Sequence, residues 1–161
     1  MTRYGLLLAW LVPVAAFASP QLLTPPPPPA TRDLGPVVAR LVDDTTKDPA
    51  SQARAFRTLM GMGQAAVPYV VAHLGDGRKL AEQSIWVQGV TGRVDVQYHP
   101  WYVHDGLLAV LKEITGFSRA SLNGHALPSQ RERNTRKWVS YCEERYPAKA
   151  SVCQEALANI P

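Results

Sequence analysis

Cysteine is scarce in this sequence, and several residue patterns that define well-known enzyme classes are missing from it. The 161 residues include two cysteines, Cys142 and Cys153, which do not form a CxxC pair. Two thiols are too few for a cysteine-based zinc site. The chain also has no HExxH helix, no nucleophile elbow and no phosphate-binding loop. Enzymes that depend on these motifs are therefore excluded.

A strong excess of one charge is also missing. Lys and Arg number 17 against 13 Asp and Glu, which gives a net charge of +4 spread along the chain. Nucleic-acid binders concentrate a much larger positive charge in one patch. The sequence therefore predicts no nucleic-acid partner.

Apolar runs long enough to matter to a membrane are confined to the N-terminus. Residues 1–18 have a short positive start that includes Arg3, continue through an apolar run over 4–17 and end in the small-x-small site Ala16-Phe17-Ala18. This is the pattern of a cleaved export signal. We expect a periplasmic or secreted protein with no transmembrane segment after cleavage, and the alternative is that the signal is retained as an anchor.

Residues 19–32 are predicted to be a linker, because they contain the unbroken proline run 25–29. Proline lacks a backbone N–H and favours an extended polyproline helix. The folded domain is therefore expected at 33–161.

Helical periodicity begins directly after this linker. Apolar residues recur at i, i+3, i+4, i+7 and i+8 over residues 34–42, the spacing of a buried helix face. Asp48-Pro49 supplies an N-cap and a first-turn proline for a second helix, which Gly61 ends. A third helix follows at 67–74, and the short link predicts that the second and third helices lie antiparallel.

This pair of helices carries a recognisable pattern. Residues 60–68 have the sequence Met-Gly-Met-Gly-Gln-Ala-Ala-Val-Pro, and Asp76, Arg78 and Ala81 follow. The segment resembles a HEAT-type helical repeat, in which a glycine ends one helix, Val-Pro opens the next, and an Asp turn and Arg-x-x-Ala come after it.

A second likeness lies downstream, where residues 111–116 and Trp138 are similar to the terminal segment of exported bacterial HEAT-like proteins. The resemblance covers 48–84 well and 104–146 loosely. It implies an all-α fold of antiparallel HEAT-like helix pairs, with at most two or three degenerate repeats.

One segment departs from the helical pattern. Val94, Val96 and Tyr98 alternate with polar residues, a period of two that is typical of a strand. Thr91-Gly92 is a candidate turn, with 85–90 as the opposing strand. We therefore expect one short β-hairpin that packs against the helices, because an isolated ribbon is only marginally stable.

The C-terminal part is predicted to be helical again. Asp105 is a candidate N-cap, and Ser129 with Glu132 is a candidate capping box for a long helix. Cys142 and Cys153 fall on the inward faces of two consecutive helices, which predicts a disulfide. Two buried free thiols are the alternative.

Histidines are the candidates for catalytic chemistry. His99, His104 and Asp105 fall within seven residues, and His73 with Asp76 could approach from an earlier turn. Three such ligands would suit a zinc ion with an open position for water. The spacing matches no standard motif, so we predict no metal site and no cofactor.

Aromatic and basic residues are the candidates for binding. Trp101 and Tyr102 lie next to Pro100, and aromatics with polar tips dominate binding hot spots. Trp86 and Tyr98 are instead expected to fill the seam between ribbon and helices. The cations of the 131–137 segment are candidates for a docking edge with an acidic partner, or for an ordinary solvated helix face: Arg131, Arg133, Arg136 and Lys137.

These observations favour a non-enzymatic exported binding or scaffold module, because stacked helix pairs expose ridges suited to protein contacts. The candidate surface is the segment 97–104, which includes His99, and the expected partner is another protein of the cell envelope. One alternative is a metal-dependent hydrolase built on His99, His104 and Asp105. Another is a periplasmic inhibitor or immunity protein.

Overall fold

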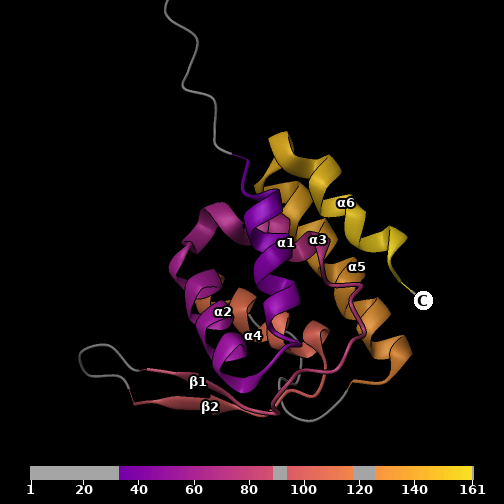
Figure 1. Ribbon diagram of the computed structural model, residues 1–161. Helices are drawn as coiled ribbons and strands as arrows, with labels where there is room; N and C mark the ends of the chain where they lie inside the picture. The colour runs from indigo at the N-terminus through magenta and orange to yellow at the C-terminus, as the bar shows by residue number, and fades with distance from the viewer. Residues whose placement is uncertain (1–32, 89–93, 118–125, 161) are drawn as a thin grey trace, which may run out of the picture. The chain divides into compact units, whose positions relative to one another are not determined.

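The computed structural model describes residues 33–88, 94–117 and 126–160 (Figure 1). The predicted export signal at 1–18, the linker at 19–32 and the Thr91-Gly92 turn lie outside these residues.

The described part is mostly helical and includes one short antiparallel ribbon (Figure 1), as the sequence predicts in coarse form. The elements are α1 (Gly35–Asp44), α2 (Pro49–Gly61), α3 (Val67–Ala72), β1 (Ile85–Val87), β2 (Val96–Tyr98), α4 (Val103–Thr115), α5 (Pro128–Arg145) and α6 (Ala150–Ala158). Single-turn 3₁₀ helices at Gly63–Ala66 and Pro147–Lys149 precede α3 and α6. None of the described helices is long and apolar enough to span a bilayer.

The start of α2 follows the sequence prediction. The carboxylate of Asp48 accepts the backbone N–H of Ser51 at 2.8 Å, and Pro49 occupies the first turn. This bond satisfies one of the N–H groups that a helix start leaves open.

Two other helix starts differ from the prediction. Asp105 is not the N-cap of α4: the helix begins at Val103, Tyr102 is the capping residue, and Asp105 lies in the first turn. An acidic residue is favoured in the first turn, because the N-terminal end of a helix carries a partial positive charge.

The predicted capping box of Ser129 and Glu132 is also wrong. Helix α5 begins at Pro128, and the side chain of Gln130 accepts the N–H of Leu127 at 2.8 Å. Proline is suited to the first helical position because it has no N–H to satisfy there.

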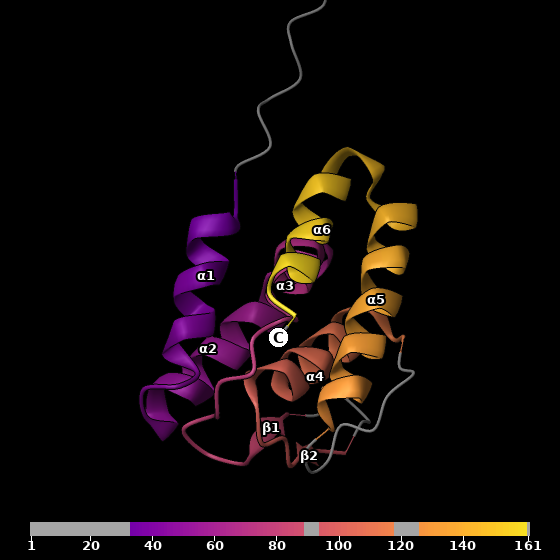
Figure 2. The same cartoon turned by 90° about the vertical axis from the view of Figure 1, so that its right-hand side faces the viewer.

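Helix α3 is the centre of the helical body rather than one half of an antiparallel pair. All six of its residues are buried, and it packs mainly against α6, α4, α5 and α1 (Figure 2). Helix α2 packs mainly against α1 and α4. A helix that is apolar on all sides is buried among several neighbours. The predicted pairing of the second and third helices is therefore not among the main helix contacts.

A buried amide attaches the segment before the ribbon to α2. Gln52 of α2 is 1 % exposed, and its Nε2 donates to the carbonyls of Glu82 and Ser84 at 2.7 and 3.0 Å. Its Oε1 accepts the N–H of Glu82 at 2.8 Å. These bonds satisfy backbone groups of Glu82 and Ser84 just before β1. Without Gln52 these backbone groups would have to bond to water.

The predicted disulfide is present. Cys142 of α5 and Cys153 of α6 are bonded, and both residues are fully buried. The bond closes the turn around Pro147–Lys149 and is consistent with an oxidising compartment.

Candidate functional site

The ribbon presents a tryptophan to solvent. In the register of the two strands Ile85 lies opposite Tyr98 and Trp86 lies opposite Gln97. Because side chains alternate between the two faces of a ribbon, Ile85 and Tyr98 share the inner face and Trp86 and Gln97 share the outer one. Ile85 is 3 % exposed, whereas Trp86 is 60 % exposed.

The inner face is fixed to α4 through Tyr98. Its hydroxyl donates to the carboxylate of Glu113, and the ammonium of Lys112 lies 4.9 Å from the centre of its ring. Burial is the main cause that raises the pKa of Tyr98, and Glu113 adds to it. The outer face is therefore presented on a ribbon that is held from below.

The same alternation continues past the end of β2. Tyr98 and Pro100 are buried, whereas His99 and Trp101 are exposed. The backbone is held here as well, because the carbonyl of Trp101 accepts the N–H of Leu80 at 3.1 Å. We call Trp86, Gln97, His99 and Trp101 the ribbon face.

Large exposed hydrophobic side chains gather on this part of the molecule. Of the six such residues in the described part, three lie on or beside the ribbon: Trp86, Val94 and Trp101. Single exposed apolar residues are ordinary, but a group of them with two tryptophans is typical of an interaction surface.

The structure brings one predicted basic residue to the flank of the ribbon face. The guanidinium of Arg131 lies 4.8 Å from the centre of the Tyr102 ring, and its Nη1 donates to the carbonyl of Ala126 at 3.2 Å. Tyr102 is consequently half-buried. Tyr102 and Arg131 thus form a cation–π pair beside the face rather than part of it.

The other predicted cations are placed differently. Arg133 and Arg136 are exposed on the outer side of α5. Arg136 pairs with Glu132 one turn earlier at 2.9 Å. The structure gives these two residues a solvated helix face.

The proposed metal ligands are not brought together. His104 is fully buried and Asp105 is 2 % exposed in the first turn of α4, whereas His99 lies on the exposed ribbon face. Within the described ranges no group of three His, Cys, Asp or Glu side chains is placed to hold a metal ion. The ligand set of the hydrolase alternative is therefore not supported.

His104 has a structural task instead. Its Nδ1 donates to the carbonyl of Leu74 at 2.6 Å, and the hydroxyl of Thr135 donates to the same carbonyl at 3.3 Å. These bonds satisfy a carbonyl that the end of α3 leaves open. Burial lowers the pKa of His104 to about 4, so the ring is neutral near pH 7.

Trp86 is the functional candidate that sequence reasoning missed. The expectation that it fills the seam with Tyr98 is right for Tyr98 and wrong for Trp86. The missed signal is that Ile85 and Val87 flank Trp86, so a strand that turns these two aliphatic residues inward must turn the tryptophan outward.

Comparison with protein-family models, curated proteins and solved structures finds no match for this chain.

Proposed function

We propose that this protein is a non-enzymatic exported binding module that engages a protein partner through the ribbon face. The observation that carries the proposal is the exposure of Trp86 and Trp101, 60 % and 38 %, on a backbone held by hydrogen bonds. Tryptophan contributes a large contact area with few rotatable bonds, so little conformational entropy is lost when it is buried by a partner.

The surroundings of the ribbon face suit a protein ligand. His99 and Gln97 supply polar groups beside the two tryptophans, and Arg131 lies at the flank over the ring of Tyr102. An apolar centre with a polar and basic margin is the usual anatomy of a protein interface. The matching partner surface is apolar with acidic groups at its edge.

Export belongs to the same proposal. The signal pattern at 1–18 supports it, and the Cys142–Cys153 disulfide agrees with an oxidising compartment such as the periplasm. The partner is then expected in the cell envelope.

A HEAT-like origin of the helical body is proposed with it. The pattern at 60–68 supports this origin, and so does the mostly helical fold. Such a body serves as a rigid support for the ribbon.

The test is capture of a partner with the full chain from an envelope extract, followed by measurement of Kd for the captured protein. We expect Trp86→Ala with Trp101→Ala to raise Kd by roughly 30-fold, the effect of losing about 2 kcal/mol at a hot spot. Val37→Ala is the matched control, because Val37 on α1 is exposed to 39 % and lies off the ribbon. Equal binding by the double variant and the control would contradict the proposal.

A further inference from the structure

The ribbon face carries two tryptophans whose separation is set by an extended backbone. Trp86 lies opposite Gln97 in the register of β1 and β2, and Trp101 follows Gln97 by four positions. The chain stays extended past β2, because Tyr102 has φ −120° and ψ 158° and forms a bridge with Lys79. An extended chain rises about 3.3 Å per residue, so the two tryptophans are about 13 Å apart along the strand.

The ribbon face is uncharged and offers hydrogen-bond donors. None of its four residues is Asp, Glu, Lys or Arg. Trp86 carries an indole N–H, and Gln97 donates one amide N–H to the hydroxyl of Ser84 at 3.0 Å. The amide of Gln97 has a second N–H. A ligand that suits this face is therefore uncharged and apolar, and it accepts hydrogen bonds.

The chain itself contains a segment with these properties. Residues 25–29, which lie outside the described residues, are five consecutive prolines. Proline has no N–H, and a polyproline helix has no internal hydrogen bonds, so its carbonyls are acceptors without partners. At about 3.1 Å per residue, such a helix measures about 12 Å from the first proline to the last. The proline run therefore matches the ribbon face in length, charge and hydrogen bonding.

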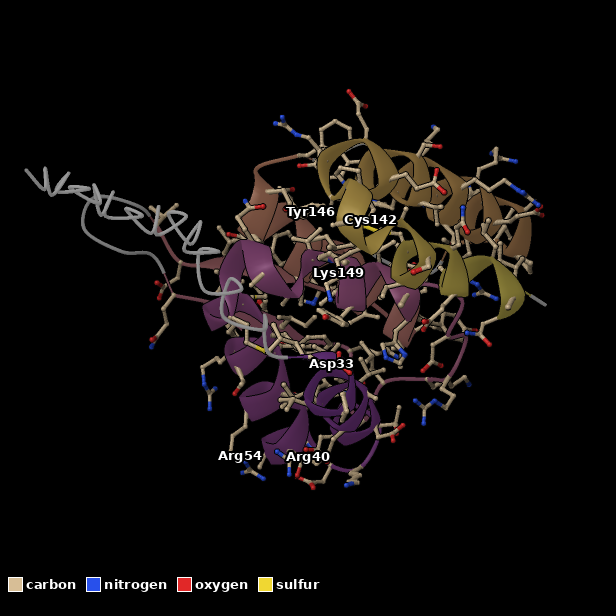
Figure 3. All side chains as sticks on the ribbon, turned by 90° about the horizontal axis from the view of Figure 1, so that it is seen from above. Asp33, Arg40, Arg54, Cys142, Tyr146 and Lys149 are labelled. Atoms are coloured by element: carbon tan, nitrogen blue, oxygen red, sulfur yellow. A yellow bond between two sulfur atoms is a disulfide. The ribbon has the colours of Figure 1, made fainter. Side chains whose placement is uncertain are left out.

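The length of the connecting chain indicates that the proline run comes from a second copy. Pro29 precedes Asp33 by four residues, and four residues span at most about 14 Å. Figure 3 views the molecule from the end where α1 starts and shows Asp33 there. From this end α1 runs about 15 Å toward the ribbon, which lies beyond it (Figures 1 and 2). The connection is too short for the run to lie along the ribbon face of its own copy.

We infer that the ribbon face binds the proline run 25–29 of a second copy of this chain, with Trp86 and Trp101 packed on prolines near its two ends. This inference rests on the proposed function and names its partner. The donors of Trp86 and Gln97 then meet proline carbonyls. Aromatic surfaces suit polyproline helices, because the helix is formed in advance and loses little conformational entropy on binding.

The first experiment is a titration of the dilute full chain with a synthetic peptide of residues 21–31, followed by NMR of the indole N–H groups. We expect the signals of Trp86 and Trp101 to shift, whereas Trp138, which is 5 % exposed, keeps its signal. Trp86→Ala and Trp101→Ala are each expected to weaken peptide binding about 10-fold. Leu157→Ala is the matched control, because Leu157 is exposed to 37 % and lies on α6.

The second experiment measures sedimentation of the full chain over a range of concentrations. We expect self-association that the synthetic peptide suppresses. A double variant with Pro26→Ala and Pro28→Ala keeps the length and the lack of charge of the run but disrupts the polyproline helix. It is expected to associate about 10-fold more weakly than the unaltered chain.

Equal binding of a control peptide with alanine at 25–29 would reduce the effect to general apolar contact and overturn the inference. Peptide binding without self-association would assign the proline-rich segment to another protein and overturn the second-copy assignment. Capture of an envelope partner through Trp86 and Trp101 by a chain that does not bind the peptide would also overturn the inference. That result would leave the proposed function standing, which separates the two tests.

Discussion

At the scale of single residues, the buried imidazole of His104 limits how acidic the surroundings of the folded chain can become. Its pKa is about 4 in the folded state against 6.5 for a free histidine, because burial disfavours the charged ring. Below pH 6.5 the imidazole of His104 is therefore protonated in the unfolded chain and still neutral in the folded chain. Stability is intact above about pH 6.5 and falls by about 3 kcal/mol as the pH drops to 4.

We predict that urea unfolding at pH 7 and pH 4.5 will show this loss, and that His104→Gln will remove most of the histidine-linked slope. Burial also lowers the pKa of His73, which contributes a smaller change in the same direction. An unchanged slope in the variant would mean that other groups govern the acid response.

Some properties of single residues could be predicted from the sequence and others could not. The exposure of Trp101 and His99 and the pairing of Cys142 with Cys153 follow from alternation and helix faces, which are local properties. The burial of His104 does not, because its partner Leu74 is thirty positions away, in the turn that follows α3. Contacts of that kind depend on tertiary packing.

At the scale of secondary-structure elements, the approach of α4 to α2 depends on a residue without a side chain. A Cβ at Gly106 would lie 2.6 Å from Cζ of Phe56 and 3.4 Å from Cδ1 of Ile85. Phe56 is 2 % exposed and fills the core, so its ring has little room to move.

We predict that Gly106→Ala lowers the free energy of unfolding by about 1–3 kcal/mol through overpacking. This loss would exceed the gain of about 1 kcal/mol that alanine brings to a helix. Gly61→Ala is the control, because a Cβ there meets nothing within 4 Å. Thermal unfolding should show opposite shifts, and a stabilised Gly106→Ala variant would refute the close-contact argument.

Element prediction succeeded where periodicity is strong and failed at boundaries. The helix at 34–42 and the strand around Val96 were found because their apolar spacing is regular. The N-caps of α4 and α5 were misplaced by three residues and two residues, because several polar residues compete as caps. Proline at position 128 decides the second case.

At the scale of the whole described unit, α6 is joined to the rest by its packing on α3 and by the disulfide to α5. The closed loop of about a dozen residues limits the unfolded chain and stabilises the fold by about 3 kcal/mol in the chain-entropy model. We predict that the Cys142→Ala, Cys153→Ala double variant loses about this much.

Chemical denaturation of the oxidised wild type, the reduced wild type and the double variant measures this contribution. The two forms without the bond should agree with each other. Equal stability of all three would show that helix packing alone holds α6.

The place of the ribbon in the molecule belongs to this scale as well. The ribbon lies at the end of the helical body opposite to the start of α1 (Figures 1 and 2). The sequence-level resemblance predicted a helical body and left the choice of partner open.

The attachment made by Gln52 has one more consequence. Its three hydrogen bonds reach main-chain atoms of Glu82 and Ser84, and none reaches a side chain. Such an anchor is indifferent to the identity of the outward residues. Substitutions at the outward positions of the ribbon should therefore leave these bonds intact, so the proposed binding face can change its side chains while the ribbon keeps its attachment to α2.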